Sequence, residues 1–233
     1  KFVFRSSLIA LSKDYDIVFA TSTPLTISIP AILAKYLRKK TFVFEVRDLW
    51  PEIPKALGVI KNPILLKMID LLERLSYHSA DACIGLSPGI VEGIKEKSND
   101  KKPVFMIPNG CDIQLFSAIK KYPNIIDLKE DDFLAIFCGT HGLANGVGSI
   151  IEAAAELKKR NKNKIKILLI GDGAEKKSLE KKAYEENLSN VFFHEPIEKE
   201  HLASVMKYAD LGLQVLSNHE VFYYGTSPNK FFV

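Results

Sequence analysis

The sequence has few of the residues that build metal centres and disulfide frameworks. Its three cysteines are far apart and form no CxxC pair, and its five histidines lack the spacing of metal ligands. No apolar run approaches the roughly 20 residues of a spanning helix, and no signal peptide is recognisable at the start. We therefore expect a cytoplasmic protein with reduced thiols and without a bound metal.

Two phosphate-binding fingerprints are absent as well. The glycine-rich stretch FCGTHGLANGVG, residues 137–148, has neither the GxGxxG spacing of a dinucleotide-binding loop nor a Walker lysine. The sequence also lacks the dense basic stripe with interleaved aromatics that is typical of nucleic-acid binding. We expect no nucleic-acid partner.

The composition is that of an ordinary soluble globular protein, with 47% hydrophobic and 26% charged residues in 233. Charge is uneven along the chain: residues 1–115 hold 16 Lys+Arg against 12 Asp+Glu, whereas residues 116–233 hold 16 of each. A mildly basic first half favours contact with an anionic membrane surface or a phosphorylated partner. The alternative is that these are scattered, solvated lysines.

Short apolar runs alternate with helical patterns along the whole chain, which is typical of parallel sheets covered by helices. We predict strands at residues 16–20, 41–46, 83–87, 104–108, 133–138, 165–170, 191–194 and 211–215. The main predicted helices are at residues 63–78, 145–159, 175–186 and 199–208. The pattern indicates an α/β protein of two Rossmann-like domains, residues 1–115 and 116–233.

Ligands of open parallel sheets bind beyond the carboxyl ends of the strands, so the loops there are the candidate sites. In residues 137–157, an apolar strand leads through Gly139 and Gly142 into an amphipathic helix. Glycines allow close approach of the backbone, and free N–H groups at a helix start suit a diphosphate. The alternative is a connection whose tight packing needs small residues.

Two further loops of the second half follow predicted strands. Gly171 and Gly173 bracket Asp172 in a pattern that, taken alone, is more typical of a tight turn than of a binding site. In the loop after residues 191–194, Glu195, Pro196 and Ile197 form a rigid segment whose backbone can face a flat base.

In the first half, the loop EVRDLWPEIP concentrates Arg47, Asp48, Glu52 and the only tryptophan, Trp50. This combination suits a sugar or another hydroxylated acceptor, with the indole as an apolar platform. The alternative is a local ion pair beside a packed tryptophan. The leucine-rich helix at residues 63–78 indicates a buried helix or a surface that touches lipid.

The chain closes on YYGTSPNKFFV, in which Ser227 followed by Pro228 is typical of a helix start. Only five residues follow, too few for a stable helix. We therefore expect this sequence to be part of a longer protein.

Six segments, in this order, resemble the retaining glycosyltransferases of the GT4 family, which have the two-domain GT-B fold. They are ERLSYHSADACIGLSPGIVEGI, VFMIPNGCDIQLF, FCGTHGLANG, ILLIGDGAEKKSLEKKA, VFFHEPIEKEHLASVMKYADLGL and GTSPNKFF. The sequence is most similar to bacterial sugar transferases of O-antigen, colanic acid and capsule assembly. Both domains would be incomplete in this chain.

The resemblance implies metal-independent transfer of a sugar from a nucleotide-sugar donor, a UDP-sugar, to a lipid-linked or saccharide acceptor, at the inner face of the cytoplasmic membrane. It implies donor binding by the following residues: Gly139, Thr140, His141, Gly142, Asn145, Gly171, Gly173, Glu195, Pro196, Ile197, Ser227, Asn229 and Lys230. It implies acceptor binding by Thr21, Arg47, Asp48, Trp50 and Glu52. Lys230 and Asp48 are the candidate catalytic residues, Lys230 as a partner of the departing diphosphate.

The sequence departs from the family pattern in its last motif. The family's paired glutamates would fall at Gly225 and Val233, and Asn145 stands where relatives often carry a basic residue. Two alternatives therefore stay open beside the transferase: a non-catalytic module that binds a nucleotide sugar or a protein partner, and a sugar-nucleotide epimerase of the same fold.

Overall fold

The computed structural model describes residues 1–98, 102–117 and 124–228, which form two compact units. The first unit contains residues 1–109 and 219–228, and the second contains residues 110–218. The sequence predicted a boundary after residue 115 and assigned everything beyond it to the second domain. The structure instead packs residues 219–228 with the first unit, because Gly89 lets the carbonyl of Tyr224 approach where a Cβ would lie 2.1 Å away.

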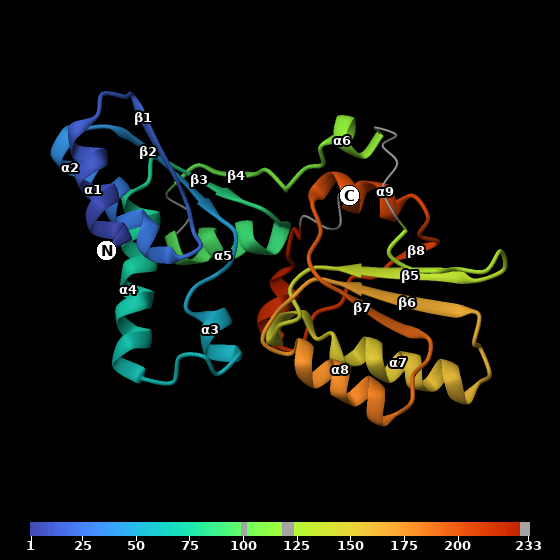
Figure 1. Cartoon of the computed structure of the whole chain (residues 1–233). Coiled ribbons are helices and arrows are strands. Elements are labelled where there is room, and N and C mark those ends of the chain that lie inside the picture. The colour runs from blue at the N-terminus through green and yellow to red at the C-terminus, as the bar shows by residue number, and fades with distance from the viewer. Residues whose placement is uncertain (99–101, 118–123, 229–233) are drawn as a thin grey trace. The chain divides into compact units, whose positions relative to one another are not determined.

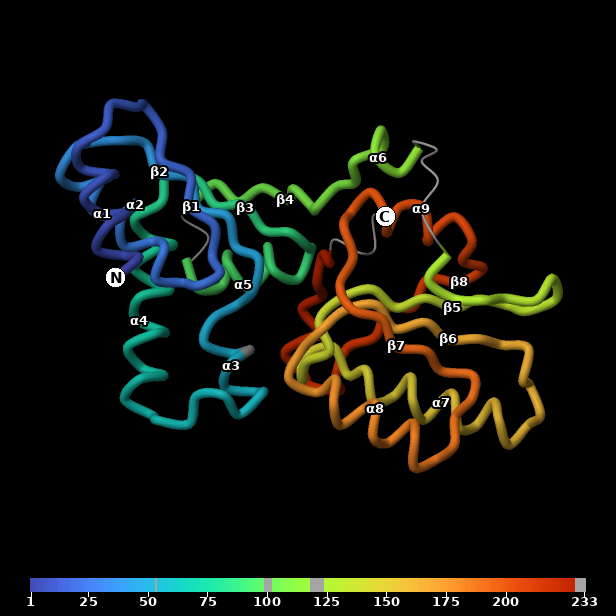
Figure 2. Tube along the Cα trace, viewed as in Figure 1, coloured from blue at the N-terminus to red at the C-terminus, as the bar shows by residue number. Residues whose placement is uncertain are grey.

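The first unit is built on a four-stranded parallel sheet in the order β1-β2-β3-β4 (Figure 1). Its elements are α1 Phe2–Ser12, β1 Ile17–Thr21, η1 Leu25–Ile27, α2 Ser28–Arg38, β2 Thr41–Val46, α3 Glu52–Ala56, α4 Pro63–Ser79, β3 Ala82–Gly85, α5 Pro88–Ser98, β4 Val104–Met106 and the 3-10 turn η3 Glu220–Tyr224. Figure 2 traces α1 and α2, which pack side by side near the N-terminus.

The core of this unit lies on one face of the sheet. Alternate residues of β2 are fully buried there, namely Phe42, Phe44 and Val46. Helix α4 contributes Tyr77 and helix α5 contributes Ile94 to the same cluster. The period of two in β2 is that of a strand with one strongly buried face.

The second unit has a parallel sheet in the order β7-β6-β5-β8. Its elements are α6 Ile113–Ser117, β5 Phe133–Cys138, η2 Leu143–Asn145, α7 Gly148–Lys159, β6 Ile165–Ile170, α8 Lys176–Glu185, β7 Val191–His194, α9 Lys199–Met206 and β8 Leu211–Gly212. Figure 1 shows α7 and α8 together on one face of the sheet and α9 on the other.

Both faces of this sheet are buried. In β5, Phe137 joins a core with Ile151 of α7, while the neighbouring Ile136 joins a second core with Val205 of α9. Parallel strands covered on both faces leave their carboxyl ends as the place where loops and helix starts converge. This arrangement positions the candidate site.

Most predicted strands match the structure, and four of them, at residues 41–46, 133–138, 165–170 and 191–194, match to the residue. Helix α7 begins at Gly148 and not at residue 145, because Gly146 takes a left-handed φ of +57° that interrupts a helix. The last predicted strand is shorter than expected, since β8 comprises Leu211 and Gly212 alone. Helix α1 was not predicted.

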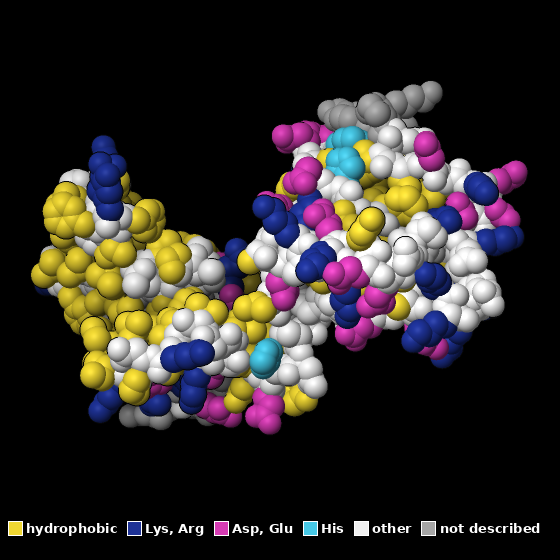
Figure 3. Space-filling view, turned by 60° about the horizontal axis from the view of Figure 1, so that its bottom comes forward, with side chains coloured by type: hydrophobic (Ala, Val, Ile, Leu, Met, Phe, Trp, Pro, Cys, Tyr) yellow, Lys and Arg dark blue, Asp and Glu magenta, His cyan; other side chains and the backbone are white. Residues whose placement is uncertain are grey.

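Residues 63–78 were predicted to form a buried helix or a surface that touches lipid, and the structure does not bury this helix throughout. One face of α4 is buried, but its apolar residues Ile64, Leu65, Met68, Leu71 and Leu75 are 44 to 72% exposed. Figure 3 shows hydrophobic side chains over much of the visible surface of the first unit. None of the helices in the described ranges is long and apolar enough to span a membrane.

Candidate functional site

A pocket of about 440 Å³ lies in the second unit at the carboxyl ends of β5 and β6 and the loop after β7. Five residues that the sequence proposed for donor binding line it: Gly139, Thr140, Gly171, Pro196 and Ile197. The remaining wall includes Phe116 of α6 and Lys199 at the start of α9. Its volume is within the range of small-molecule sites.

The floor of this pocket is formed by two loops whose backbones are hydrogen-bonded to each other. The N–H of Gly139 donates to Ile170 O and that of His141 donates to Asp172 O, each at 2.9 Å. A Cβ on Gly171 would lie 2.0 Å from Gly139 O, and one on Gly173 would lie 2.4 Å from His141 O. These two glycines are therefore required by the close approach of the loops.

Lys176, at the first position of α8, is a buried lysine that the sequence analysis did not single out. Its Nζ donates to Gly171 O at 3.0 Å, to His194 O at 3.4 Å and to Glu195 Oε1 at 2.6 Å. Because one ammonium group holds the segments after β6 and β7, Lys176 fixes two sides of the pocket relative to each other. Glu195 itself is 74% exposed.

His141 was proposed for donor binding, and the structure places its side chain inside the protein. The residue is fully buried, with its ring 5.9 Å from that of Phe137 and 6.2 Å from that of Phe193. Neither ring nitrogen has a hydrogen-bond partner among the described residues. Burial, with the charge of Lys176 as a lesser cause, lowers the pKa of His141.

The rest of the glycine-rich loop bends through η2 before α7 begins. Gly142 precedes this turn, and the side chain of Asn145 donates to Thr140 O at 2.7 Å, which closes the loop on itself. Gly146 permits a backbone approach to Leu216 and Ser217 that a Cβ would block. The structure thus gives Asn145 a role in shaping the loop that carries Thr140.

In the first unit, hydroxyl side chains at the end of β1 hold the start of the loop after β2. Ser22 Oγ accepts a hydrogen bond from Arg47 N at 3.0 Å, and Thr23 Oγ1 donates to Asp48 Oδ2 at 3.4 Å. Thr21 Oγ1 donates to Glu45 Oε2. Burial raises the pKa of Asp48, opposed by the Thr23 hydrogen bond and by the charge of Arg47.

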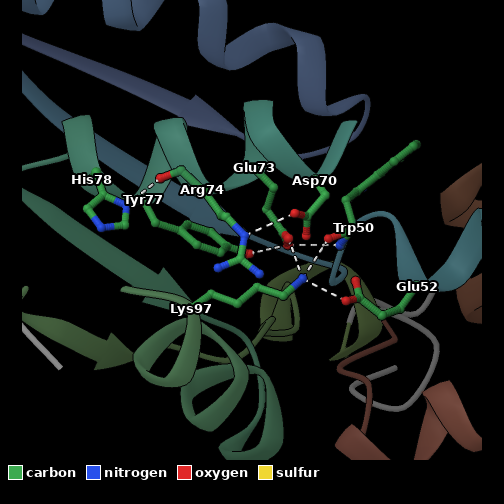
Figure 4. Close-up of polar contacts among 8 residues, drawn as sticks. All are labelled: Trp50, Glu52, Asp70, Glu73, Arg74, Tyr77, His78 and Lys97. Atoms are coloured by element: carbon green, nitrogen blue, oxygen red, sulfur yellow. Dashed lines mark hydrogen bonds and ion pairs between the residues drawn. The ribbon is translucent and has the colours of Figure 1, made fainter. Parts of the chain in front are cut away.

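The middle of the same loop is held by a buried carboxylate from one helix and a partly buried ammonium group from another (Figure 4). Glu73 Oε1 of α4 accepts from Trp50 N at 3.0 Å, while Lys97 Nζ of α5 donates to Trp50 O at 2.8 Å and to Glu52 Oε1 at 2.7 Å. Glu73 Oε2 also pairs with Lys97 Nζ. Of the proposed acceptor residues, Arg47, Asp48, Trp50 and Glu52 are therefore neighbours along one segment, in which Glu52 pairs with Lys97, while Thr21 lies at the end of β1.

The closing motif divides between described and undescribed residues. Ser227 lies in the first unit, where its Oγ accepts from Asn109 N at 3.0 Å and its carbonyl accepts from Asn109 Nδ2. Asn229 and Lys230, proposed as donor contacts, lie outside the described residues. In the ranges that the structure describes, no group of three or more His, Cys, Asp or Glu residues could hold a metal ion.

Two family models together match almost the whole chain. Residues 2–110 match a glycosyl transferase 4-like domain, and residues 118–222 match the glycosyl transferases of group 1. The chain belongs to the glycosyltransferases, with a 4-like domain in its first half and a group 1 domain in its second. The predicted fold of two domains with parallel sheets is confirmed.

Similar proteins support the assignment of this chain to the glycosyltransferases. WbjE of Pseudomonas aeruginosa, named as a glycosyltransferase, is 26% identical over 194 residues, which cover 82% of this chain and 48% of that protein. WcaI of Escherichia coli, named as a glycosyl transferase of colanic acid biosynthesis, is 24% identical over 192 residues, 79% of this chain and 46% of that one. The chain thus spans about half the length of these curated relatives.

A solved structure with the same fold is that of HepE from Anabaena in complex with UDP-glucose. It superposes with a TM-score of 0.64 at 16% identity, covering 92% of this glycosyltransferase chain and 56% of the other. At that identity the likeness establishes the fold alone.

Several residues at these sites escaped the sequence analysis. Lys176 and Glu73 are buried, and the Lys97 side chain is only 16% exposed. The sequence of a helix seldom shows which of its charged residues will be covered when the helix packs. For Glu73 one signal was available, because it follows two leucines in the apolar stretch of residues 64–72. Phe116 belongs to a five-residue helix whose contact with α9 is a tertiary feature.

Proposed function

We propose that this chain is part of an enzyme that transfers a sugar from a nucleotide donor, a UDP-sugar, to a lipid-linked or saccharide acceptor in cell-surface polysaccharide biosynthesis. The anomeric configuration is retained and no metal takes part. The observation that carries the proposal is the pocket of about 440 Å³ at the carboxyl ends of β5 and β6, in the unit that matches the group 1 transferases. The UDP-glucose bound by HepE and the colanic acid role in WcaI's name support the donor and the pathway class.

The donor is proposed to lie with its base between Phe116 and the Pro196–Ile197 segment. Phe116, Pro196 and Ile197 all line the pocket, and an aromatic ring together with an apolar segment suits contact with a flat base. The diphosphate then lies over the backbone of Gly139 and Thr140, where glycine leaves room for close approach. Lys230 is proposed to neutralise the departing diphosphate, which is the charge that develops in the transition state.

The acceptor is proposed to bind the loop after β2. Asp48 has a raised pKa, and a carboxylate of higher pKa is a better hydrogen-bond acceptor for the attacking hydroxyl. Among the described residues, Trp50 Nε1 and Glu52 Oε2 are buried without a hydrogen-bond partner. A hydroxylated acceptor would provide partners for both, and an unpaired buried polar group costs about 1–3 kcal/mol.

The test is an activity screen of the full-length protein with UDP-, GDP- and dTDP-sugars, each with and without lipid-linked and free saccharide acceptors. Release of nucleoside diphosphate that depends on an acceptor supports the transferase, and a product with inverted configuration would refute retention. Binding of a nucleotide sugar without turnover across the panel would instead establish a non-catalytic module. An epimerised donor formed without acceptor would establish an epimerase. Activity that survives chelation supports the metal-independent mechanism.

We also propose peripheral contact with the inner face of the cytoplasmic membrane through α4. Ile64, Met68, Leu71 and Leu75 recur at helical spacing and are exposed, and the neighbouring Lys61 and Lys67 suit anionic lipid. Flotation with vesicles of phosphatidylglycerol and with neutral phosphatidylcholine vesicles tests this. Binding to neither would refute the contact.

A further inference from the structure

We propose that Glu73 and Lys97 are positioning residues of the acceptor site. Glu73 binds the backbone N–H of Trp50 and Lys97 binds its C=O, and together they fix the loop that carries Arg47 and Asp48. This inference rests on the proposed function, because it gives the loop its role. It adds two residues, from α4 and α5, that lie outside the loop itself.

The first step is that the three hydrogen-bond donors of the Lys97 ammonium group match three acceptors. Its Nζ donates to Trp50 O, Glu52 Oε1 and Glu73 Oε2. A lysine ammonium has three N–H groups, so all are used. Lys97 is thus committed to this one arrangement of the loop, and its side chain is only 16% exposed.

The second step is that Glu73 completes the clamp from the opposite side. Its residue exposure is 1%, and its Oε1 accepts from both Trp50 N and Tyr77 Oη, the latter at 2.6 Å. The N–H and the C=O of Trp50 are therefore each bonded to a different member of one ion pair. Figure 4 shows Glu73 and Lys97 pointing toward each other beside Trp50.

The third step is that the same face of α5 is shaped to receive the loop. Gly93 lies one helical turn before Lys97, and a Cβ there would be 2.6 Å from Cδ1 of Leu49. Residues four apart share one face of a helix. Gly93 thus admits Leu49 while Lys97 binds the next residue of the loop, so that one helix face contacts two consecutive loop residues.

A buried ion pair is weak support for stability, because desolvation offsets most of the attraction. Directional bonds to a backbone N–H and C=O do, however, specify one loop geometry. The chain offers a matched comparison in Lys35 and Asp81, a less buried ion pair whose carboxylate caps Phe42 N near the amino end of β2.

The experiment compares Glu73→Gln, Lys97→Met and their double variant with Lys35→Met and Asp81→Asn in the full-length protein. Trp50 is the only tryptophan of this sequence, and its fluorescence is isolated by subtracting the signal of the Trp50→Phe protein. We expect acrylamide quenching of Trp50 to rise about twofold in the clamp variants, as the peptide is released. The Lys35 and Asp81 variants should leave it unchanged.

The double variant separates positioning from stability. Lys97→Met leaves the Glu73 carboxylate buried and without its ion pair, and the added Glu73→Gln change removes that charge, so thermal stability should recover in part relative to Lys97→Met. Quenching of Trp50 should not recover. With the donor and acceptor found in the activity screen, kcat/KM for the acceptor should fall at least about tenfold in all three variants while the donor KM stays within about twofold.

Recovery of quenching and acceptor kinetics together with stability would overturn the proposal, since the pair would then be purely structural. Unchanged quenching in Lys97→Met would overturn it as well. If the activity screen finds no transfer, the proposed function fails, but the fluorescence result still decides whether Glu73 and Lys97 fix the loop.

Discussion

Replacing Lys176 by methionine should destabilise the second unit and weaken nucleotide binding together. Of the three acceptors of Lys176 Nζ, His194 O also accepts from Gly171 N at 3.1 Å, so it keeps a partner. Gly171 O is left unpaired in a buried residue, which costs about 1–3 kcal/mol. The pair with Glu195 contributes about 0–1 kcal/mol, because Glu195 is mostly exposed.

The expected loss of unfolding free energy is therefore about 1–4 kcal/mol, since the methionine stem keeps most of the packing. Urea unfolding followed by circular dichroism measures it. The same variant should weaken UDP binding about fivefold, a loss of about 1 kcal/mol, because the walls after β6 and β7 are no longer tied together. Titration calorimetry measures this second effect.

The neighbouring Lys177 is exposed and provides the matched control. Lys177→Met should change unfolding free energy by less than about 0.5 kcal/mol and leave UDP binding unchanged. Equal stability of the two variants would refute the reasoning about the Gly171 carbonyl. Full UDP affinity in a destabilised Lys176→Met protein would show that the lysine supports the fold without shaping the pocket.

Three further predictions concern the same unit. Gly171→Ala should cost about 3 kcal/mol in urea unfolding because its Cβ meets backbone, whereas Gly110→Ala, with open space around it, should be tolerated. Phe116→Ala should weaken UDP binding by about 1–3 kcal/mol in calorimetry if the base stacks on the ring, and Phe116→Tyr should retain affinity. The folded state lowers the pKa of His141, so unfolding free energy should fall as pH drops below the unfolded value of about 6.5. His141→Leu should reduce that dependence in pH-resolved unfolding.

Local sequence patterns predicted most of the strands and the main helices of the fold, although they missed helix α1. The run FLAIFC predicted β5 to the residue because every side chain of a central parallel strand is apolar, and Asn62 before Pro63 predicted the start of α4, where its side chain accepts from Ile64 N and Leu65 N. The start of α7 was missed because a left-handed glycine gives no distinct signal among four glycines. The membership of residues 219–228 depends on packing against Gly89, which no local pattern contains.

The sequence predicted where the candidate site lies, at the carboxyl ends of the strands. It did not predict which way each side chain of the loops points. Gly139, Gly171, Pro196 and Ile197 follow strand ends and do line the pocket. His141 belongs to the same loop, yet its side chain turns into the core between two phenylalanine rings. Which way a loop side chain turns depends on neighbours distant in sequence, and the pattern of the loop does not record it.

In both units, ionisable side chains are buried at comparable places in the fold. Among the described residues, the buried ones that carry a carboxylate, an imidazole or an ammonium group are Glu73, His141 and Lys176. Each belongs to, or bonds to, a segment just after a strand: Glu73 binds the Trp50 peptide after β2, His141 follows β5, and Lys176 binds Gly171 after β6.

Burying such a group costs free energy unless it is bonded, and a buried ion pair is by itself weak support for stability. The amino ends of the strands rely on more exposed charge, as in the pair of Lys35 and Asp81. Buried charge at the carboxyl ends is therefore best explained by the need for fixed loop geometry where ligands bind. Substituting these residues should therefore lower ligand affinity as well as stability, whereas disrupting the Lys35–Asp81 pair should lower stability alone.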